Sequence, residues 1–277
     1  MYAKVNGTRL YYTSLGKGRP VIFLHGGLGF DHTYFRPWVE PLAKRFRVIF
    51  YDHRGNGRSE GRDSLQDVDH STWHDDLDAL RAYLGFDKFV LVGHSYGGAL
   101  GQGYALRYQK HLSGLALVTT YCAWDYMDEI VANARARGTP EQAKAVKDML
   151  IKHVPSDEAF AQLGGVILPL YFKRFDPKVA ERIGATTKLS YQAFNRGFID
   201  CHKTFDLTAR LPEIKVSTLV IAGRDDWIMP VPRVERIHRG IPNSKLVMFE
   251  ESGHFPFIEE RKKFLKVLGD WMEALPA

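Results

Sequence analysis

GHSYGG, residues 93–98, surrounds one serine with three glycines and directly follows the apolar run FVLV at 89–92. A glycine-rich turn of this kind either cradles a phosphate on backbone N–H groups or holds a serine nucleophile at a bend between a strand and a helix. A P-loop would need a lysine after the glycines, and a dinucleotide-binding loop would need G-x-G-x-x-G, but this stretch supplies neither. It fits G-x-S-x-G, and we predict that Ser95 is a nucleophile.

The rest of the chain carries a series of short, continuously apolar runs, which end at Gly27, Gly55, Ser95, Cys122, Asp226 and His254. Runs without polar alternation are typical of strands buried on both faces, and helical patterns lie between several of them. This order predicts an α/β fold with a mostly parallel central sheet flanked by helices. In such a sheet, ligands bind at the carboxyl ends of the strands. A hairpin with Asn6-Gly7 as its turn opens the chain.

Residues 123–206 interrupt this alternation. They contain no convincing strand pattern and consist of helical segments, so we predict a helical cap inserted between two parts of one core, 1–122 and 207–277. An insertion between two strands at their carboxyl ends is placed to cover the site. The apolar stretch GGVILPLYF, 164–172, either lines an acyl pocket or packs the cap on the core.

The segment STWHDDLDALRAYLG, 71–85, predicts an amphipathic helix with Ser71 as its N-cap and a stop at Gly85. The spacing of His70, His74 and Asp75 could suit a metal ion on one helix face. We place these residues on the polar face of the helix and expect solvated side chains, so we predict no metal site.

A serine hydroxyl needs a base to take its proton and an acid to orient that base. In hydrolases with this bend, the acid and then the histidine follow the serine along the chain. AGRDDWIMP, 222–230, places Asp226 just past an apolar run in a G-x-x-D-x-x-x-P pattern, with Asp225 as the alternative acid. His254 follows the last run. We therefore predict that Asp226 and His254 meet Ser95 at one edge of the sheet.

The tetrahedral oxyanion of acyl transfer needs two hydrogen-bond donors. One is the N–H that follows the nucleophile, which belongs to Tyr96, and the other comes from the loop after an early strand. HGGLG, 25–29, follows such a strand, and we predict Gly27 as the second donor with Leu28 next. His25 is interpreted as a structural residue of that loop.

Composition narrows the class of protein. The chain has 277 residues, is 45% hydrophobic and 25% charged, and carries a formal net charge of +6. Its Lys and Arg residues are scattered rather than gathered into a run, so we expect no nucleic-acid partner. No signal-peptide core and no window of about 18 consecutive apolar residues is present, which predicts a soluble, cytoplasmic protein without a membrane span. Cys122 and Cys201 fit no metal or redox spacing and are interpreted as isolated buried thiols.

Five motifs in order resemble the α/β-hydrolase fold superfamily over nearly the whole chain: HGGLG (25–29), DHRGNGRS (52–59), GHSYGG (93–98), GRDDWIMP (223–230) and SGH (252–254). The resemblance implies a catalytic triad without cofactor or metal and makes residues 52–59 a structural turn, with Asp52, Arg54, Gly55, Gly57 and Ser59 as scaffold.

Within the superfamily, HGGLG and YGGALGQGYALRYQKHLSGLAL, 96–117, are similar to the proline iminopeptidase-like branch. Members that cleave N-terminal proline hold the free amine with acidic residues, one directly after the triad aspartate and others in the cap. In this chain Trp227 follows Asp226, and the cap stretch AFNRGFID, 193–200, offers only Asp200. This departure disfavours peptidase activity.

We therefore predict a serine hydrolase that cleaves carboxylic esters or lactones, with acyl-homoserine lactones among the latter, through an acyl-enzyme. The alternatives are an aminopeptidase on the same triad and a slow-turnover receptor that uses the same pocket. Acyl transfer to an acceptor other than water would use the same triad. The predicted substrate-pocket residues are Trp124, Leu168, Phe198 and Trp227.

Overall fold

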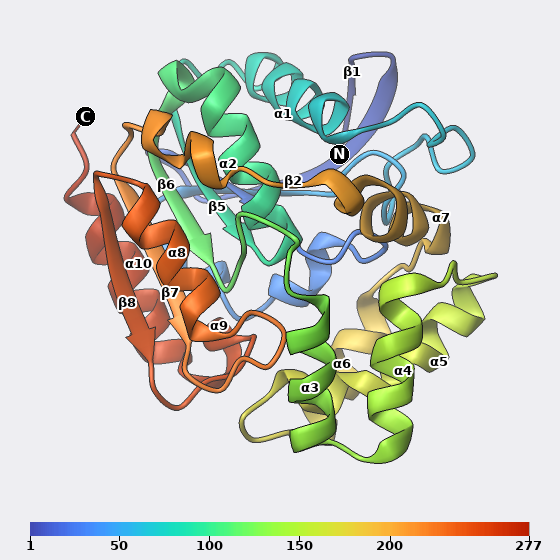
Figure 1. The fold of residues 1–277 in the computed structure, drawn as a ribbon. Coiled ribbons are helices and arrows are strands. Elements are labelled where there is room, and N and C mark those ends of the chain that lie inside the picture. Colours follow the sequence, from blue (N-terminus) through green and yellow to red (C-terminus); the bar gives the residue numbers. More distant parts are fainter. Residues whose placement is uncertain (277) are drawn as a thin grey trace.

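A computed structural model describes residues 1–276. Its single sheet has eight strands in the order β1-β2-β4-β3-β5-β6-β7-β8 (Figure 1). The pairs β1/β2 and β2/β4 are antiparallel and the remaining pairs are parallel. The strands are β1 Tyr2–Val5, β2 Thr8–Leu15, β3 Pro20–Leu24, β4 Arg47–Tyr51, β5 Phe89–His94, β6 Leu112–Val118, β7 Thr218–Gly223 and β8 Ser244–Phe249. The mostly parallel α/β sheet predicted from the apolar runs is confirmed.

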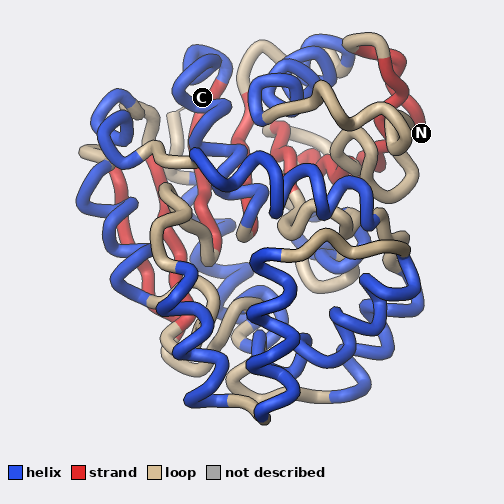
Figure 2. Tube along the Cα trace, turned by 45° about the vertical axis from the view of Figure 1, so that its right-hand side comes forward, coloured by secondary structure: helices blue, strands red, loops and turns tan. Residues whose placement is uncertain are grey.

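Helices cover both faces of this sheet (Figure 2). The helices are α1 His70–Tyr83, α2 Tyr96–Tyr108, α3 Met127–Arg137, α4 Pro140–Ile151, α5 Asp157–Ile167, α6 Pro177–Thr186, α7 Tyr191–Phe194, α8 Val231–Gly240, α9 Pro256–Glu259 and α10 Arg261–Glu273. Short turns of helix include η1 His32–Phe35, η4 Leu168–Tyr171, the π-helix η5 Asn195–Cys201 and η6 His202–Thr204.

The apolar strands are buried on both faces, as their unbroken hydrophobicity predicts. Val21 and Phe23 of β3 join one apolar cluster, which includes residues of η1 and α10. Ile22 and Leu24 join the other, which includes residues of α1 and α2. Successive side chains of a strand point to opposite faces, so each face receives half of the run.

The first hairpin turns at Asn6-Gly7, as predicted. Asn6 has φ 44° and Gly7 has φ 71°, which are the positive values that a two-residue hairpin turn requires. β1 and β2 pair on either side, with Val5 opposite Thr8.

Helix α1 begins at His70, and its N-cap is Asp69, so the prediction of Ser71 as N-cap is wrong. The carboxylate of Asp69 accepts the backbone N–H of Thr72 at 3.0 Å, and the Thr72 hydroxyl reaches back to the N–H of Asp69 in a capping box. Gly85 follows the helix with φ 72°, which suits the predicted stop.

The prediction that His70 and His74 lie on a solvated face is also wrong. His74 is buried, and an added Cβ on Gly103 of α2 would overlap its ring. His70 is partly buried and its Nε2 bonds the hydroxyl of Tyr96 at 2.7 Å. The two histidines share a helix face because they are four residues apart, and that face packs on α2. Asp75 pairs with Arg107 at 2.7 Å, and residues 1–276 contain no cluster of His, Cys, Asp and Glu that could hold a metal ion.

Along the chain, helices α3 to α7 come between β6 and β7. In space they lie on the side toward which the arrowheads of β6 and β8 point in Figure 1. The ends of this insertion lie beside each other, since the N–H of Trp124 bonds the carbonyl of Phe205 at 3.0 Å and the N–H of Leu207 bonds that of Cys122 at 2.7 Å. We keep 123–206 as the proposed extent of the cap.

Cys122 is buried, Cys201 is partly buried, and both are free. None of the helices within residues 1–276 combines the length and apolar character that crossing a membrane would require.

Candidate active site

Ser95 occupies the bend between β5 and α2 in a strained backbone conformation, with φ 55° and ψ −124°. Its N–H bonds the carbonyl of Val118 on the neighbouring strand at 2.9 Å. An added Cβ on Gly93 would overlap the carbonyl oxygen of Gly97, and one on Gly97 would overlap that of Leu24. The two glycines of G-x-S-x-G are therefore required by close backbone contacts, and they leave the Ser95 side chain partly exposed.

His254 and Asp226 form a buried hydrogen-bonded pair. His254 Nδ1 lies 2.7 Å from Asp226 Oδ2, and the two residues are 2% and 4% exposed. The other carboxylate oxygen of Asp226 accepts the backbone N–H groups of Ile228 at 3.1 Å and Met229 at 3.0 Å. These bonds hold the carboxylate in place, and a proton donated from Nδ1 leaves Nε2 of His254 free to act as a base.

Asp225, the alternative acid, makes different contacts. Its side chain is 34% exposed and pairs with Lys173 at 3.2 Å, while its N–H bonds the carbonyl of Ser252 at 3.0 Å. The structure thus brings Asp226, and not its neighbour, to His254.

The carbonyl of His254 is anchored beside the nucleophile. It accepts the Thr119 hydroxyl at 3.0 Å and lies 3.0 Å from Nε2 of His94, the residue before Ser95. Among the hydrogen bonds within residues 1–276, none joins the Ser95 hydroxyl to Nε2 of His254. In enzymes without bound substrate, catalytic hydrogen bonds are often long and tighten only in the substrate complex.

The loop HGGLG lies directly against the nucleophile, since an added Cβ on Gly26 would stand 2.7 Å from the Ser95 Cβ. The N–H of Gly26 bonds the Tyr34 hydroxyl at 2.5 Å, and the N–H of Gly29 bonds Asn56 Oδ1 at 2.6 Å. These bonds leave the N–H groups of Gly27 and Leu28 as the candidate oxyanion donors of the loop. Gly27 has φ 41°, a conformation that favours glycine. The other candidate, the N–H of Tyr96, opens α2, where the helix dipole favours negative charge.

The side chain of His25 links this loop to the adjacent turn through hydrogen bonds. Its Nε2 accepts the N–H of His53 at 3.1 Å, so Nδ1 carries the proton and bonds the carbonyl of Gly26 at 3.0 Å. Burial lowers the pKa of His25 and keeps the ring neutral. In the adjacent turn, Asp52 accepts the N–H of Arg58 at 2.9 Å. These contacts agree with the structural roles predicted for His25 and Asp52.

Two of the four predicted pocket residues meet beside Tyr96. Trp124 and Phe198 pack edge to face with ring centroids 5.1 Å apart, and Phe198 lies 6.4 Å from Tyr96. His202 stacks on Trp124 at 4.4 Å and lies 4.6 Å from Tyr96. No sequence spacing pointed to His202. The core and the cap meet in this aromatic cluster, which contacts the residue that follows the predicted nucleophile.

The other two predicted pocket residues, Trp227 and Leu168, are not part of this aromatic cluster. Trp227 is buried next to Asp226, and its ring stands edge to face with Tyr171 at 5.3 Å. Leu168 is half-buried and packs with Tyr171 against the core. Sequence reasoning singled out the stretch containing Tyr171 but not the residue itself. Its ring lies 5.2 Å from that of His254, and its carbonyl accepts the His254 N–H at 2.7 Å.

A model of the alpha/beta hydrolase fold family matches residues 19–147 and 160–261. The chain belongs to the α/β-hydrolase fold family. It is 29% identical over 299 residues to a proline iminopeptidase of Saccharolobus solfataricus, an alignment that covers 98% of this chain and 91% of that protein.

Solved structures of this family share the whole fold. A thermophilic esterase from Thermogutta terrifontis matches with a TM-score of 0.77 and 25% identity, covering 99% of this chain and 97% of the esterase. The enol-lactonase from Burkholderia xenovorans LB400 matches with a TM-score of 0.73 and 25% identity, covering 99% of this chain and 100% of the lactonase. Hydrolases with different names therefore share the family fold of this chain.

The α/β-hydrolase site of this chain offers no unpaired buried carboxylate within residues 1–276. The buried ones are Asp31, Asp52, Asp76 and Asp226. Their partners are Arg58, His32, Arg54 and His254, respectively. Asp200, the acidic residue of the cap stretch, is 33% exposed and pairs with His153 at 3.0 Å. None of these carboxylates is left to receive a substrate amine.

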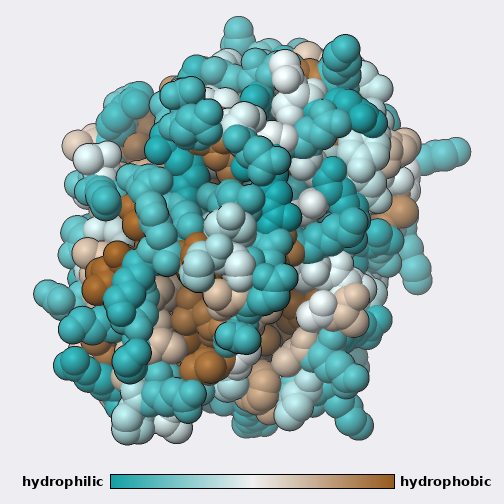
Figure 3. Space-filling view, turned by 90° about the vertical axis from the view of Figure 1, so that its right-hand side faces the viewer, coloured by the Kyte–Doolittle hydropathy of each residue, from teal (hydrophilic) through white to brown (hydrophobic). Residues whose placement is uncertain are grey.

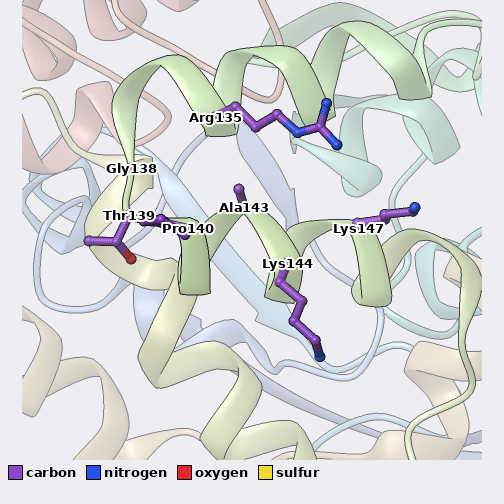
Figure 4. Close-up of a pocket in the computed structure, with 7 residues that line it drawn as sticks. All are labelled: Arg135, Gly138, Thr139, Pro140, Ala143, Lys144 and Lys147. Atoms are coloured by element: carbon purple, nitrogen blue, oxygen red, sulfur yellow. The ribbon is translucent and has the colours of Figure 1, made fainter.

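A separate surface hollow of about 390 Å³ lies between α3 and α4, lined by Arg135, Gly138, Thr139, Pro140, Ala143, Lys144 and Lys147 (Figure 4). Arg135 and Lys147 extend to one side of the hollow while Lys144 points away from them. The hollow contains none of the predicted site residues. Figure 3 shows the face of the molecule that lies on the right in Figure 1. This face is mainly hydrophilic, with apolar surface gathered in its lower half.

Proposed function

We propose that this α/β hydrolase cleaves small carboxylic esters or lactones through an acyl-enzyme on Ser95. The observation that carries the proposal is the buried His254–Asp226 pair, whose histidine carbonyl is anchored next to the strained Ser95 bend. A strained serine, an oriented histidine and two candidate N–H donors are the parts that acyl transfer needs.

In the proposed reaction, Nε2 of His254 takes the proton of Ser95 while Oγ attacks the carbonyl carbon of the substrate. Asp226 accepts the Nδ1 proton of His254 in a hydrogen bond and stabilises the imidazolium that forms. The N–H groups of Tyr96 and Gly27 hold the oxyanion. His254 then returns the proton to the departing alcohol oxygen, which in a lactone stays attached to the acyl group. Water, activated by His254, releases the acid and restores Ser95.

The substrate class follows from the surroundings of the triad. The buried indole of Trp227 stands where amine-binding members place a carboxylate, and every buried carboxylate in residues 1–276 already has a partner. An ammonium group next to this site would lose its hydration without gaining a counter-charge, which is unfavourable. A neutral acyl group suits the aromatic surroundings of Trp124 and Phe198 better. The esterase and enol-lactonase of the same fold support this choice.

A second candidate is an aminopeptidase, favoured by the relative named proline iminopeptidase that aligns over 98% of this chain. It would use the same Ser95, His254 and Asp226 on an amide. The paired state of Asp200 counts against it.

The test compares the wild type, Ser95→Ala and the control Ser64→Ala, an exposed serine of the core, on p-nitrophenyl acetate and butyrate, γ-lactones, an acyl-homoserine lactone and proline p-nitroanilide. We expect ester or lactone cleavage by the wild type and the control, and a loss of kcat of about 10⁴-fold or more in Ser95→Ala. Near-normal turnover by Ser95→Ala would sink the proposal. A kcat/KM for the proline anilide above that for the esters would establish the peptidase instead. If an ester shifts the melting temperatures of the wild type and of Ser95→Ala equally and no product forms, the protein is a receptor.

A further inference from the structure

Glu259, the last residue of α9, connects two segments that are distant in sequence. Its Oε2 accepts the backbone N–H of Gly253 at 2.7 Å. Its Oε1 accepts the N–H groups of Lys173 at 2.8 Å and Arg174 at 3.2 Å. One carboxylate therefore joins the loop before His254 to the cap segment that follows η4. The mechanism proposed above does not use this carboxylate.

The same two segments touch directly. The N–H of His254 bonds the carbonyl of Tyr171 at 2.7 Å, and an added Cβ on Gly253 would stand 2.5 Å from that oxygen. The ring of Tyr171 lies 5.2 Å from the imidazole of His254. The cap segment 171–174 is therefore pressed against the backbone and the ring of the predicted base.

Lys173 also contacts the segments that precede the acid Asp226 and the base His254. Its ammonium group bonds the carbonyl of Glu250 at 2.9 Å and pairs with Asp225 at 3.2 Å and Glu251 at 3.1 Å. These ion pairs lie at the surface, where each contributes little. Glu259 is partly buried, and this burial raises its pKa, while the three N–H donors oppose the rise.

We infer that Glu259 is a positioning residue that holds His254 in reach of Ser95 by fastening the histidine loop to cap segment 171–174. The inference rests on the serine-hydrolase function proposed above. A carboxylate can accept hydrogen bonds on both oxygens at once. A glutamine side chain can accept hydrogen bonds on only one of these two positions, its amide oxygen. Its NH₂ group would face the backbone N–H of Gly253 or those of Lys173 and Arg174, and two donors cannot form a hydrogen bond. One of the two segments is then released, and His254 loses part of its support.

The test uses Glu259→Gln and the matched control Glu260→Gln. Glu260 accepts the N–H of Glu251 at 3.0 Å and the Ser252 hydroxyl at 2.8 Å, so it supports the same loop without a bond to the cap. kcat and KM for p-nitrophenyl butyrate are measured on protein whose fold is verified by circular dichroism. For Glu259→Gln we expect kcat to fall about 10- to 100-fold with KM nearly unchanged, because a small displacement of a catalytic group mainly affects the chemical step. Glu260→Gln should stay within about threefold of the wild type.

A merely structural role would lower the melting temperature and leave the kcat of the folded enzyme unchanged, and that result would overturn the inference. Equal losses in the two glutamine variants would also overturn it, because any support of the loop would then suffice. If Glu259→Gln does not fold, Gly253→Ala decides, since its methyl group pushes the Tyr171 carbonyl away from the same loop. A folded Gly253→Ala with wild-type kcat contradicts the inference, and a fall in kcat supports it. Ser95→Ala is assayed in parallel: if it stays active, the proposed function fails, whereas an inactive Ser95→Ala beside a wild-type-like Glu259→Gln rejects only the role of Glu259.

Discussion

At Gly93, Gly97 and Gly223, around the predicted catalytic edge of the sheet, an added Cβ would overlap a backbone carbonyl oxygen. At the cap glycines Gly164, Gly165 and Gly184, it would meet no atom within 4 Å. The core loops are thus built by backbone segments in direct contact, which leave no room for a side chain. The helices of the cap are held by apolar side chains, which tolerate change more easily.

The cap is also closely packed where it meets the predicted oxyanion loop. A Cβ on Gly197 of η5 would overlap the side chain of Leu28 in the predicted oxyanion loop. The N–H of Ser190 bonds the carbonyl of Gly29 in the same loop at 2.8 Å. Together with the contact of Tyr171 on His254, these contacts place residues of the proposed cap against the loops that carry the predicted oxyanion donors and the predicted base.

The two neighbouring aspartates test this comparison most strongly. Asp226→Asn should reduce kcat on p-nitrophenyl butyrate by about 10⁴-fold, because an asparagine favours the wrong tautomer of His254. Asp225→Asn removes only a surface pair with Lys173 and should change kcat by less than about threefold. Steady-state kinetics of both variants provides the measurement. Equal losses of kcat in the two variants would contradict the assignment of Asp226 as the acid from its buried contact with His254.

Gly97→Ala probes the backbone contacts of the core. The new methyl group would overlap the carbonyl oxygens of Leu24 and His25, which are fixed in or beside the sheet. We expect a loss of about 3 kcal/mol in the free energy of unfolding, measured by urea denaturation, together with loss of the proposed esterase activity. A variant as stable and active as the wild type would show that the bend at Ser95 is looser than its contacts indicate.

His74 of the core is buried, whereas His153 of the cap is exposed. We therefore expect the substitution of His74, and not that of His153, to change how the free energy of unfolding depends on pH. Burial lowers the pKa of His74 from 6.5 to about 3, so its contribution to stability is present above pH 6.5 and is lost as the pH falls toward 3. His74→Leu should therefore reduce the loss of unfolding free energy between pH 6.5 and pH 4 by on the order of 3 kcal/mol. The control is His153→Leu, because the His153 side chain is 58% exposed. Thermal unfolding across this pH range checks the prediction, and parallel curves for the wild type and His74→Leu would refute it.

Gly165→Ala is the smallest test and has the opposite sign. The position lies inside α5, where alanine is favoured over glycine and meets no other atom within 4 Å. We expect a gain of about 0.5–1 kcal/mol in the free energy of unfolding, with kcat unchanged. A loss of stability would place the packing of this cap helix closer to that of the core.

The strands confirmed by the structure and the predicted site residues both come from short, local patterns in the sequence. Unbroken apolar runs predict the strands, and Ser95, Asp226 and His254 each follow such a run, so parallel strands bring them to one edge of the sheet. Ser71 as N-cap was wrong because the sequence offers two cap-forming residues and only the chain path selects Asp69.

The structural support of His254 could be seen only in the tertiary structure. Tyr171 touches its ring and backbone, and Glu259 joins its loop to Lys173, 86 positions away. The burial of His74 likewise depends on Gly103 of another helix. The sequence by itself determined the strands and the positions that carry the proposed chemistry, since these follow from local periodicity and backbone conformation. The packing of the cap on the catalytic loops was decided by contacts between distant segments, which leave no periodic trace in the chain.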